Sequence, residues 1–183
     1  MKKQIVISII LFIFTLLCLN SFLIGKNIDK YKDIPVYYNG ILLFKSYGKN
    51  YSKDGYYYGK KWQCVEFIKR FLYDVKKHKM PDTSGNAKDY YDSTIQQGKM
   101  NIRRGLIQYK NGGNIKPAVD DILVFNNGKY GHVAIVCDVN DNFVYVIQQN
   151  VFFNTRATFK IIYQNGNYYI GTYNKPICWL RKL

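Results

Sequence analysis

The longest apolar run in the chain lies near the amino terminus and extends without a charge from Ile5 to Ile24. At the rise of a helix it spans about 30 Å, the hydrocarbon thickness of a bilayer. Lys2 and Lys3 precede it and favour a cytoplasmic start. We predict that residues 1–26 form a transmembrane anchor or a signal peptide, with residues 5–24 in the membrane, and that residues 27–183 form the folded domain.

Two fates of this segment remain open. A cleaved signal peptide usually ends in a small-x-small pattern, and Leu19-Asn20-Ser21 matches it poorly, so we favour an uncleaved anchor. Either fate delivers the domain across a membrane. The expected location is therefore the cell membrane, single-pass with the domain outside the cytosol, or the exterior after secretion.

The next segments change from irregular to helical periodicity. Residues 27–55 are polar and Tyr-rich with several turn signals, and we expect only a short strand near Ile41–Phe44. From Cys64 to about Lys77 apolar residues recur at helical spacing, and Pro81 prevents any continuation. A weaker helix is expected at residues 87–97.

Short apolar runs separated by turn residues dominate the second half and predict strands. They lie at residues 121–125, 132–138, 142–150, 159–163, 168–173 and 177–181, with a hairpin around Asn165-Gly166. Helices followed by a run of strands are typical of the α+β class. We expect helices packed on an antiparallel β-sheet.

The composition adds a strong positive charge. The chain of 183 residues has a formal net charge of +15 at pH 7, which favours an anionic partner such as an acidic membrane face or a cell-wall polymer. No zinc-finger, RNA-binding or basic-helix pattern is present, so we expect no nucleic acid as a partner. The four cysteines contain no C-x-x-C pair, and Cys137 and Cys178 are either joined or ordinary thiols.

A cysteine and a histidine carry the candidate chemistry. Cys64 is expected at a helix start, where the helix dipole and unpaired amides favour a thiolate. Of the two histidines, His78 would lie about 21 Å farther along the same helix, since each residue adds 1.5 Å. His132 lies on a separate strand and is free to approach Cys64. An isolated cysteine and histidine are more often core residues, so the local motifs must decide.

The two motifs are Trp62-Gln63-Cys64-Val65-Glu66-Phe67 and Gly131-His132-Val133-Ala134. In this order they resemble the CHAP family of cysteine, histidine-dependent amidohydrolases/peptidases, in particular the amidase domain of glutathionylspermidine synthetase/amidase. The resemblance covers about residues 36–181. It implies a papain-like fold, Cys64 as nucleophile, His132 as its base, and no cofactor or metal.

The third catalytic position departs from that pattern. Where the subfamily has a glutamate, this chain has Gln148, whose neutral amide can orient the imidazole but stabilises its charge less. Asn150 would lie on the same strand face and is a possible helper. We also expect Trp62 and Gln63 to line the cleft, although Trp62 could equally be a core residue. In the amidase relatives a basic residue at the position of Lys69 meets a substrate carboxylate, so Lys69 is a candidate ligand and otherwise a solvated charge. Asp121 is expected to make a structural bond.

Three functions remain open at this point. The first is a cysteine amidase/peptidase that cleaves peptidoglycan peptides, which the membrane segment and the basic charge favour. The second is a glutathionylspermidine-type amidase, favoured by the motif likeness. The third is a non-catalytic wall- or partner-binding module, which Gln148 and the charge suggest. We expect a monomer in each case.

Overall fold

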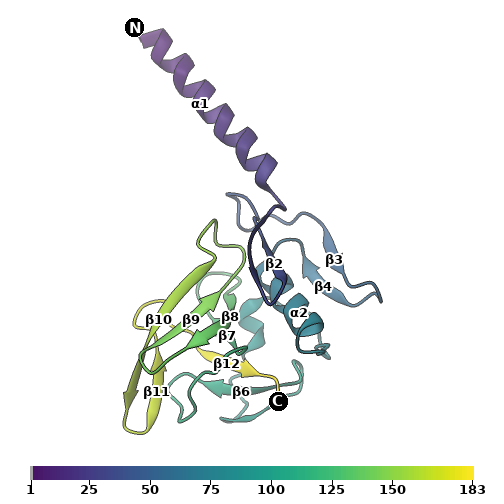
Figure 1. Cartoon of the computed structure of the whole chain (residues 1–183), viewed down its shortest axis with the longest axis vertical. Helices are drawn as coiled ribbons and strands as arrows, with labels where there is room; N and C mark the ends of the chain where they lie inside the picture. Colours follow the sequence, from purple (N-terminus) through teal and green to yellow (C-terminus); the bar gives the residue numbers. More distant parts are fainter. Residues whose placement is uncertain (1) are drawn as a thin grey trace.

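The computed structural model describes residues 2–183, and its most prominent feature is an isolated helix. Helix α1 (Lys2–Leu23) projects away from the rest of the chain, and none of its apolar window is buried (Figure 1). It is long and apolar enough to cross a membrane. The apolar amino-terminal helix expected from the sequence is therefore present.

The folded part is built on an eight-stranded antiparallel sheet with the order β11-β10-β9-β8-β7-β12-β6-β5. The strands are β5 (Lys99–Asn101), β6 (Leu106–Lys110), β7 (Ile122–Phe125), β8 (His132–Val139), β9 (Phe143–Ile147), β10 (Arg156–Gln164), β11 (Asn167–Ile170) and β12 (Cys178–Arg181). Two hairpins precede the sheet in the chain: β1 (Asn27–Tyr31) with β2 (Ile34–Tyr37), and β3 (Lys49–Tyr51) with β4 (Tyr57–Lys60).

Helix α2 (Cys64–Asp74) covers one face of this sheet. Its apolar side chains, among them Phe67, Ile68 and Phe71, are fully buried against side chains of the central strands. Alternation along the strands divides the core, so that Ile122 and Val124 face α2 while their neighbours face a second cluster under β10 and β11. Helices on an antiparallel sheet confirm the α+β prediction.

Several predicted elements in the first half are wrong. Residues 41–44 form no strand, and only a 3-10 turn (Ala87–Tyr90) occupies the range predicted as a second helix. Helix α2 ends at Asp74, and Lys77 already has a positive φ. The sequence does not predict strands β1 to β6, because they have only three to five residues and pair through tertiary contacts that periodicity does not record.

The hairpin strands at the carboxyl-terminal half agree with the sequence. β10 and β11 pair antiparallel up to Gln164 and Asn167, and the turn falls at Asn165-Gly166 as predicted. Cys137 and Cys178 carry free thiols, so of the two alternatives for this pair the structure has the unjoined one.

Candidate active site

One cleft of about 1220 Å³ gathers six of the seven candidate residues. Its walls come from the start of α2, the loop before the 3-10 helix η1 (Ala87–Tyr90), the start of β8, strand β10, and the segments that follow β9 and β11. The candidates that line it are Gln63, Cys64, Lys69, His132, Gln148 and Asn150. Trp62 does not line this cleft. Its ring packs on Tyr37 at 4.1 Å between centroids and lies under Gly25.

Cys64 opens α2 at the edge of the core. The preceding residue, Gln63, is extended, so the helix begins at Cys64 and its free amide end lies at the sulfur. The thiol is only 7% exposed. Burial raises the pKa of the thiol to about 11. The backbone N–H groups of Val133, Val65 and Cys64 itself lower the pKa, because they favour the thiolate. Desolvation is the larger effect, and the resting sulfur is a neutral thiol.

His132 begins β8 on the opposite wall. Gly131 has a φ of +71°, and a Cβ there would lie 2.6 Å from the carbonyl oxygen of Phe125. Only glycine fits this approach, which explains the glycine of the Gly-His-Val-Ala motif. Burial lowers the pKa of the imidazole to about 4, although the bond to Gln148 opposes that shift. At neutral pH the ring is uncharged.

The partner of the imidazole fixes its tautomer. His132 Nε2 lies 3.0 Å from Gln148 Oε1, and Gln148 Nε2 donates to the carbonyl oxygen of Asn154 at 2.9 Å. Because the amide nitrogen is occupied as a donor there, Oε1 is the acceptor and His132 Nε2 carries the proton. Nδ1 is then unprotonated, and the ring is equipped to accept a proton.

Gln63 and Asn150 bind each other and not the imidazole. Asn150 Nδ2 donates to Gln63 Oε1 at 2.8 Å and to the Leu43 carbonyl oxygen, and its Oδ1 accepts from Asn39. Gln63 Nε2 donates to the carbonyl oxygens of Leu43 and Lys45. Both side chains therefore hold the loop around Leu43 at the cleft, and Asn150 has no amide hydrogen left to assist His132.

Lys69 is a buried cation that lines the cleft. Its Nζ donates to the carbonyl oxygen of Thr83 at 2.7 Å and approaches that of Tyr57 at 3.4 Å, and burial lowers its pKa to about 8. Asp82 lies near enough to favour the charge but binds Arg103. Lys69 thus holds the loop before η1 and has no carboxylate of its own.

A residue that sequence reasoning missed connects the two walls. Gln149 is fully buried; its amide accepts from Arg70 and the Tyr37 amide and donates to Glu66 and the Gln63 carbonyl oxygen. Glu66 and Arg70 form a buried ion pair at 2.6 Å. The sequence offered a signal for the ion pair: a spacing of four residues places Glu66 and Arg70 on one helix face.

Asp121 makes a structural bond, as expected. Its carboxylate accepts two hydrogen bonds from Arg181 and one from the amide of Ala118. Asp120 has a φ of +76°, the conformation that glycine favours. Its carboxylate binds Lys32, Lys76 and the hydroxyl of Tyr31, which offsets the strain.

Comparison with known proteins identifies the family of the chain. The sequence model of the CHAP domain matches residues 53–150, which include both motifs. The chain belongs to the CHAP family. This is a family of amidases and peptidases.

Two curated relatives define its likeness within the CHAP family. Trypanothione synthetase of Crithidia fasciculata is 28% identical over 124 residues, which are 66% of this chain and 19% of that protein. The bifunctional glutathionylspermidine synthetase/amidase of Escherichia coli K12 is 31% identical over 122 residues, 64% of this chain and 19% of that protein. This CHAP chain therefore matches only about a fifth of the length of these relatives.

Proposed function

We propose that this CHAP protein is a cysteine amidase/peptidase that cleaves peptides of peptidoglycan at the cell envelope. The observation that carries the proposal is the hydrogen bond from His132 Nε2 to Gln148 Oε1. It leaves Nδ1 as a base in the cleft that Cys64 also lines.

In the proposed reaction the side chains of Cys64 and His132 are both neutral before the substrate is attacked. His132 Nδ1 takes the proton of Cys64 as the sulfur attacks the amide carbonyl carbon, and the backbone N–H of Cys64 faces the developing oxyanion. The C–N bond then breaks, and the imidazolium gives its proton to the leaving amine. Water, deprotonated by His132, attacks the acyl-thioester and releases the acid and the free thiol.

The charges of the cleft support an anionic substrate. Four lysines line it, namely Lys60, Lys69, Lys129 and Lys160, and among the residues described no aspartate or glutamate does. The buried Lys69 ammonium in particular has only carbonyl partners. Such a field attracts carboxylates, as in acidic stem peptides. Lys69 is the proposed ligand of one of them.

The same charges argue against the second candidate. The likeness to the bifunctional glutathionylspermidine synthetase/amidase favours a glutathionylspermidine-type amidase. Spermidine, however, carries free ammonium groups, and a cleft lined by lysines without carboxylates repels them. We therefore rank the peptide substrate first.

Helix α1 is the proposed membrane anchor of the domain formed by residues 27–183. Its 22 residues have the length of a bilayer-spanning helix and expose their apolar side chains. With α1 inserted, the domain would lie at the membrane surface, within reach of the cell wall.

Zymography on purified cell walls tests the proposal. The wild-type protein should clear the walls, and Cys64→Ala should not. Clearing by both proteins, or by neither, would count against wall hydrolysis by this thiol. Release of spermidine from glutathionylspermidine, measured in parallel, would move the assignment to the second candidate. Wall binding by both proteins without any cleavage would favour a non-catalytic module.

A further inference from the structure

Exposed apolar side chains gather on two loops at the foot of α1. The loop after β2 presents Ile41, Leu42 and Phe44, the last with 74% of its surface exposed. The loop between β9 and β10 presents Phe152 and Phe153. Figure 1 shows the two loops at the end of the domain from which α1 rises. We call these five residues the apolar patch.

Hydrogen bonds set the level of this patch along the helix. Asn20 Oδ1 accepts from the hydroxyl of Tyr38 and from the amide of Ile41, both at 3.1 Å. The ring of Tyr38 stacks on Phe153 at 4.6 Å between centroids. Asn20 lies three residues before the end of α1, about 4.5 Å from it at helical rise. The first residues of the patch are thus level with the last turn of the apolar helix.

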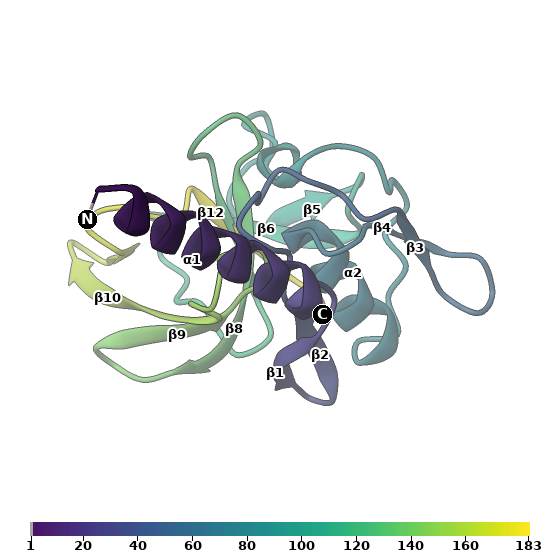
Figure 2. The same ribbon diagram turned by 90° about the horizontal axis from the view of Figure 1, so that it is seen from above.

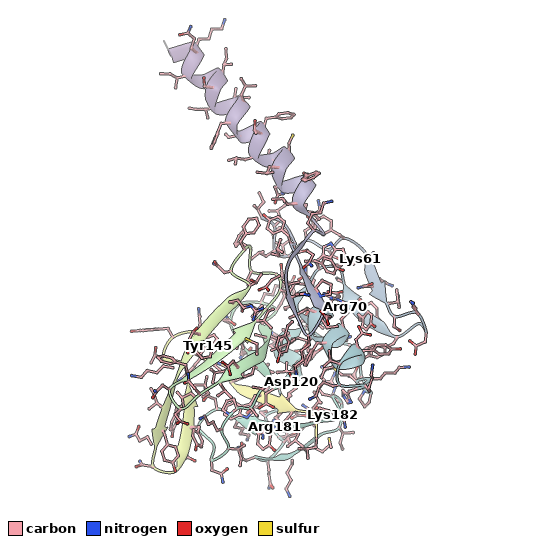
Figure 3. The ribbon with its side chains drawn as sticks, viewed as in Figure 1. Lys61, Arg70, Asp120, Tyr145, Arg181 and Lys182 are labelled. Atoms are coloured by element: carbon pink, nitrogen blue, oxygen red, sulfur yellow. The ribbon has the colours of Figure 1, made fainter. Side chains whose placement is uncertain are left out.

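The charge around the patch has one sign. Residues 35–49 and 142–157, which contain the two loops, and residues 57–63 before Cys64 contain no aspartate or glutamate. They contain Lys45 and Lys61, and Lys26 follows α1 directly. The carboxylate of Asp29, in β1, is paired with Arg156. Figure 3 shows Lys61 toward the helix end of the domain, with Asp120 and Arg181 farther from α1. Apolar side chains with basic neighbours are the composition of surfaces that bind anionic lipid interfaces.

The patch is also connected to the cleft. Leu43, Phe44 and Val151 of the same loops line it. The bonds among Asn39, Asn150 and Gln63 join both loops to the residue before Cys64. A surface that holds these loops therefore also holds the mouth of the cleft. Figure 2, seen from above, shows α1 leaning across the domain on the side of β10.

We infer that the apolar patch inserts into the interface of the bilayer that holds α1, so that the cleft opens at the membrane surface. The two attachments act together, since α1 spans the bilayer and the patch holds the loops of the cleft against its surface. The protein would then cut amide polymers close to the membrane. This inference rests on the proposed anchoring by α1, and it does not rest on the proposed hydrolysis.

Tryptophan quenching by brominated lipid tests the insertion. The full chain, carrying Cys64→Ala throughout so that hydrolysis plays no part, is reconstituted in vesicles of phosphatidylcholine and phosphatidylglycerol. The reporters are Leu42→Trp and Phe153→Trp, one from each loop. Phe12→Trp in α1 and Tyr163→Trp, an exposed aromatic next to the β10–β11 turn, are the two reference positions. The emission of Trp62 and Trp179 is subtracted using the parent protein.

We expect the strongest quenching for Phe12→Trp, weaker quenching for the two patch reporters, and none for Tyr163→Trp. The patch reporters should also emit at shorter wavelength than Tyr163→Trp. Patch reporters that match Tyr163→Trp would overturn the inference, as would an unquenched Phe12→Trp. Patch quenching in a protein whose Cys64 form fails to cut walls would keep the inference and remove the proposed function.

Discussion

Gln148 and Gln149 are neighbours in the sequence and lie in opposite environments. Gln148 is half-buried, holds His132 and faces the cleft. Gln149 is fully buried and uses every hydrogen and lone pair of its amide on groups of α2 and β2. The two residues follow the end of β9, where the chain bends, and one dipeptide serves both the cleft and the interior.

The comparison separates two physical designs. Around Gln149 the polar groups are saturated, and this fixes the position of α2 against the end of β9. Around Gln148 the side chain contacts only His132 and the Asn154 carbonyl oxygen, and the proposed mechanism needs Nδ1 of His132 and the thiol of Cys64 to be available to a substrate. The first arrangement stabilises the fold, and in the proposed mechanism the second keeps the reactive groups neutral by burial until a substrate binds.

Removal of the sulfur should have the largest effect on the cleft side. Cys64→Ala should lower kcat/KM on the preferred substrate by roughly four orders of magnitude, since no other group can form the acyl-thioester. Its cost in stability should be about 1 kcal/mol, because only one buried atom is lost. Parallel activity assays and urea unfolding measure both quantities. Retained activity would reassign the nucleophile.

Gln149→Leu should have the largest effect on the interior side. Glu66 and Arg70 each lose the hydrogen bond that they share with Gln149. We therefore expect the free energy of unfolding to fall by about 2–4 kcal/mol. Gln148→Leu, the same change one residue earlier, is the matched control. It should unfold as the wild type does while its activity falls about a hundredfold. Equal loss of stability in both variants would remove the contrast.

Gln148→Glu should raise the catalytic rate. A carboxylate stabilises the imidazolium formed during attack, and we expect about a tenfold higher kcat. In the proposed mechanism neutral His132 is the base, and the neutral form is lost as the pH falls through its pKa of about 4. A carboxylate raises that pKa, so the acid limb of the pH–rate profile should move to higher pH. An unchanged limb would show that residue 148 does not govern the ring.

Charge reversal in the cleft should have the smallest effect. Lys129→Glu or Lys160→Glu should raise KM for an anionic peptide about threefold to tenfold, since each replaces an attraction by a repulsion partly screened by water. Lys182→Glu makes the same change in net charge at the far end of the domain (Figure 3) and should leave KM unaltered. An equal rise in all three variants would indicate a general charge effect.

The sequence by itself determined the apolar helix, the α+β class and the family. These depend on local signals: an uncharged run of bilayer length, helical and alternating periodicity, and two motifs around Cys64 and His132. It also identified Gln148 as a departure from the glutamate pattern. Apart from helix α2, periodicity failed over residues 27–110, where the strands are short.

Only the tertiary structure decided the role of each polar side chain. Gln149, Asn39 and the lysines of the cleft other than Lys69 carry no local signal, because their places in the site depend on elements far along the chain. The structure also separated Trp62 from the cleft and set the apolar loops beside α1. A hydrogen bond or a shared surface depends on which segments meet, and burial then sets the pKa values of Cys64 and His132.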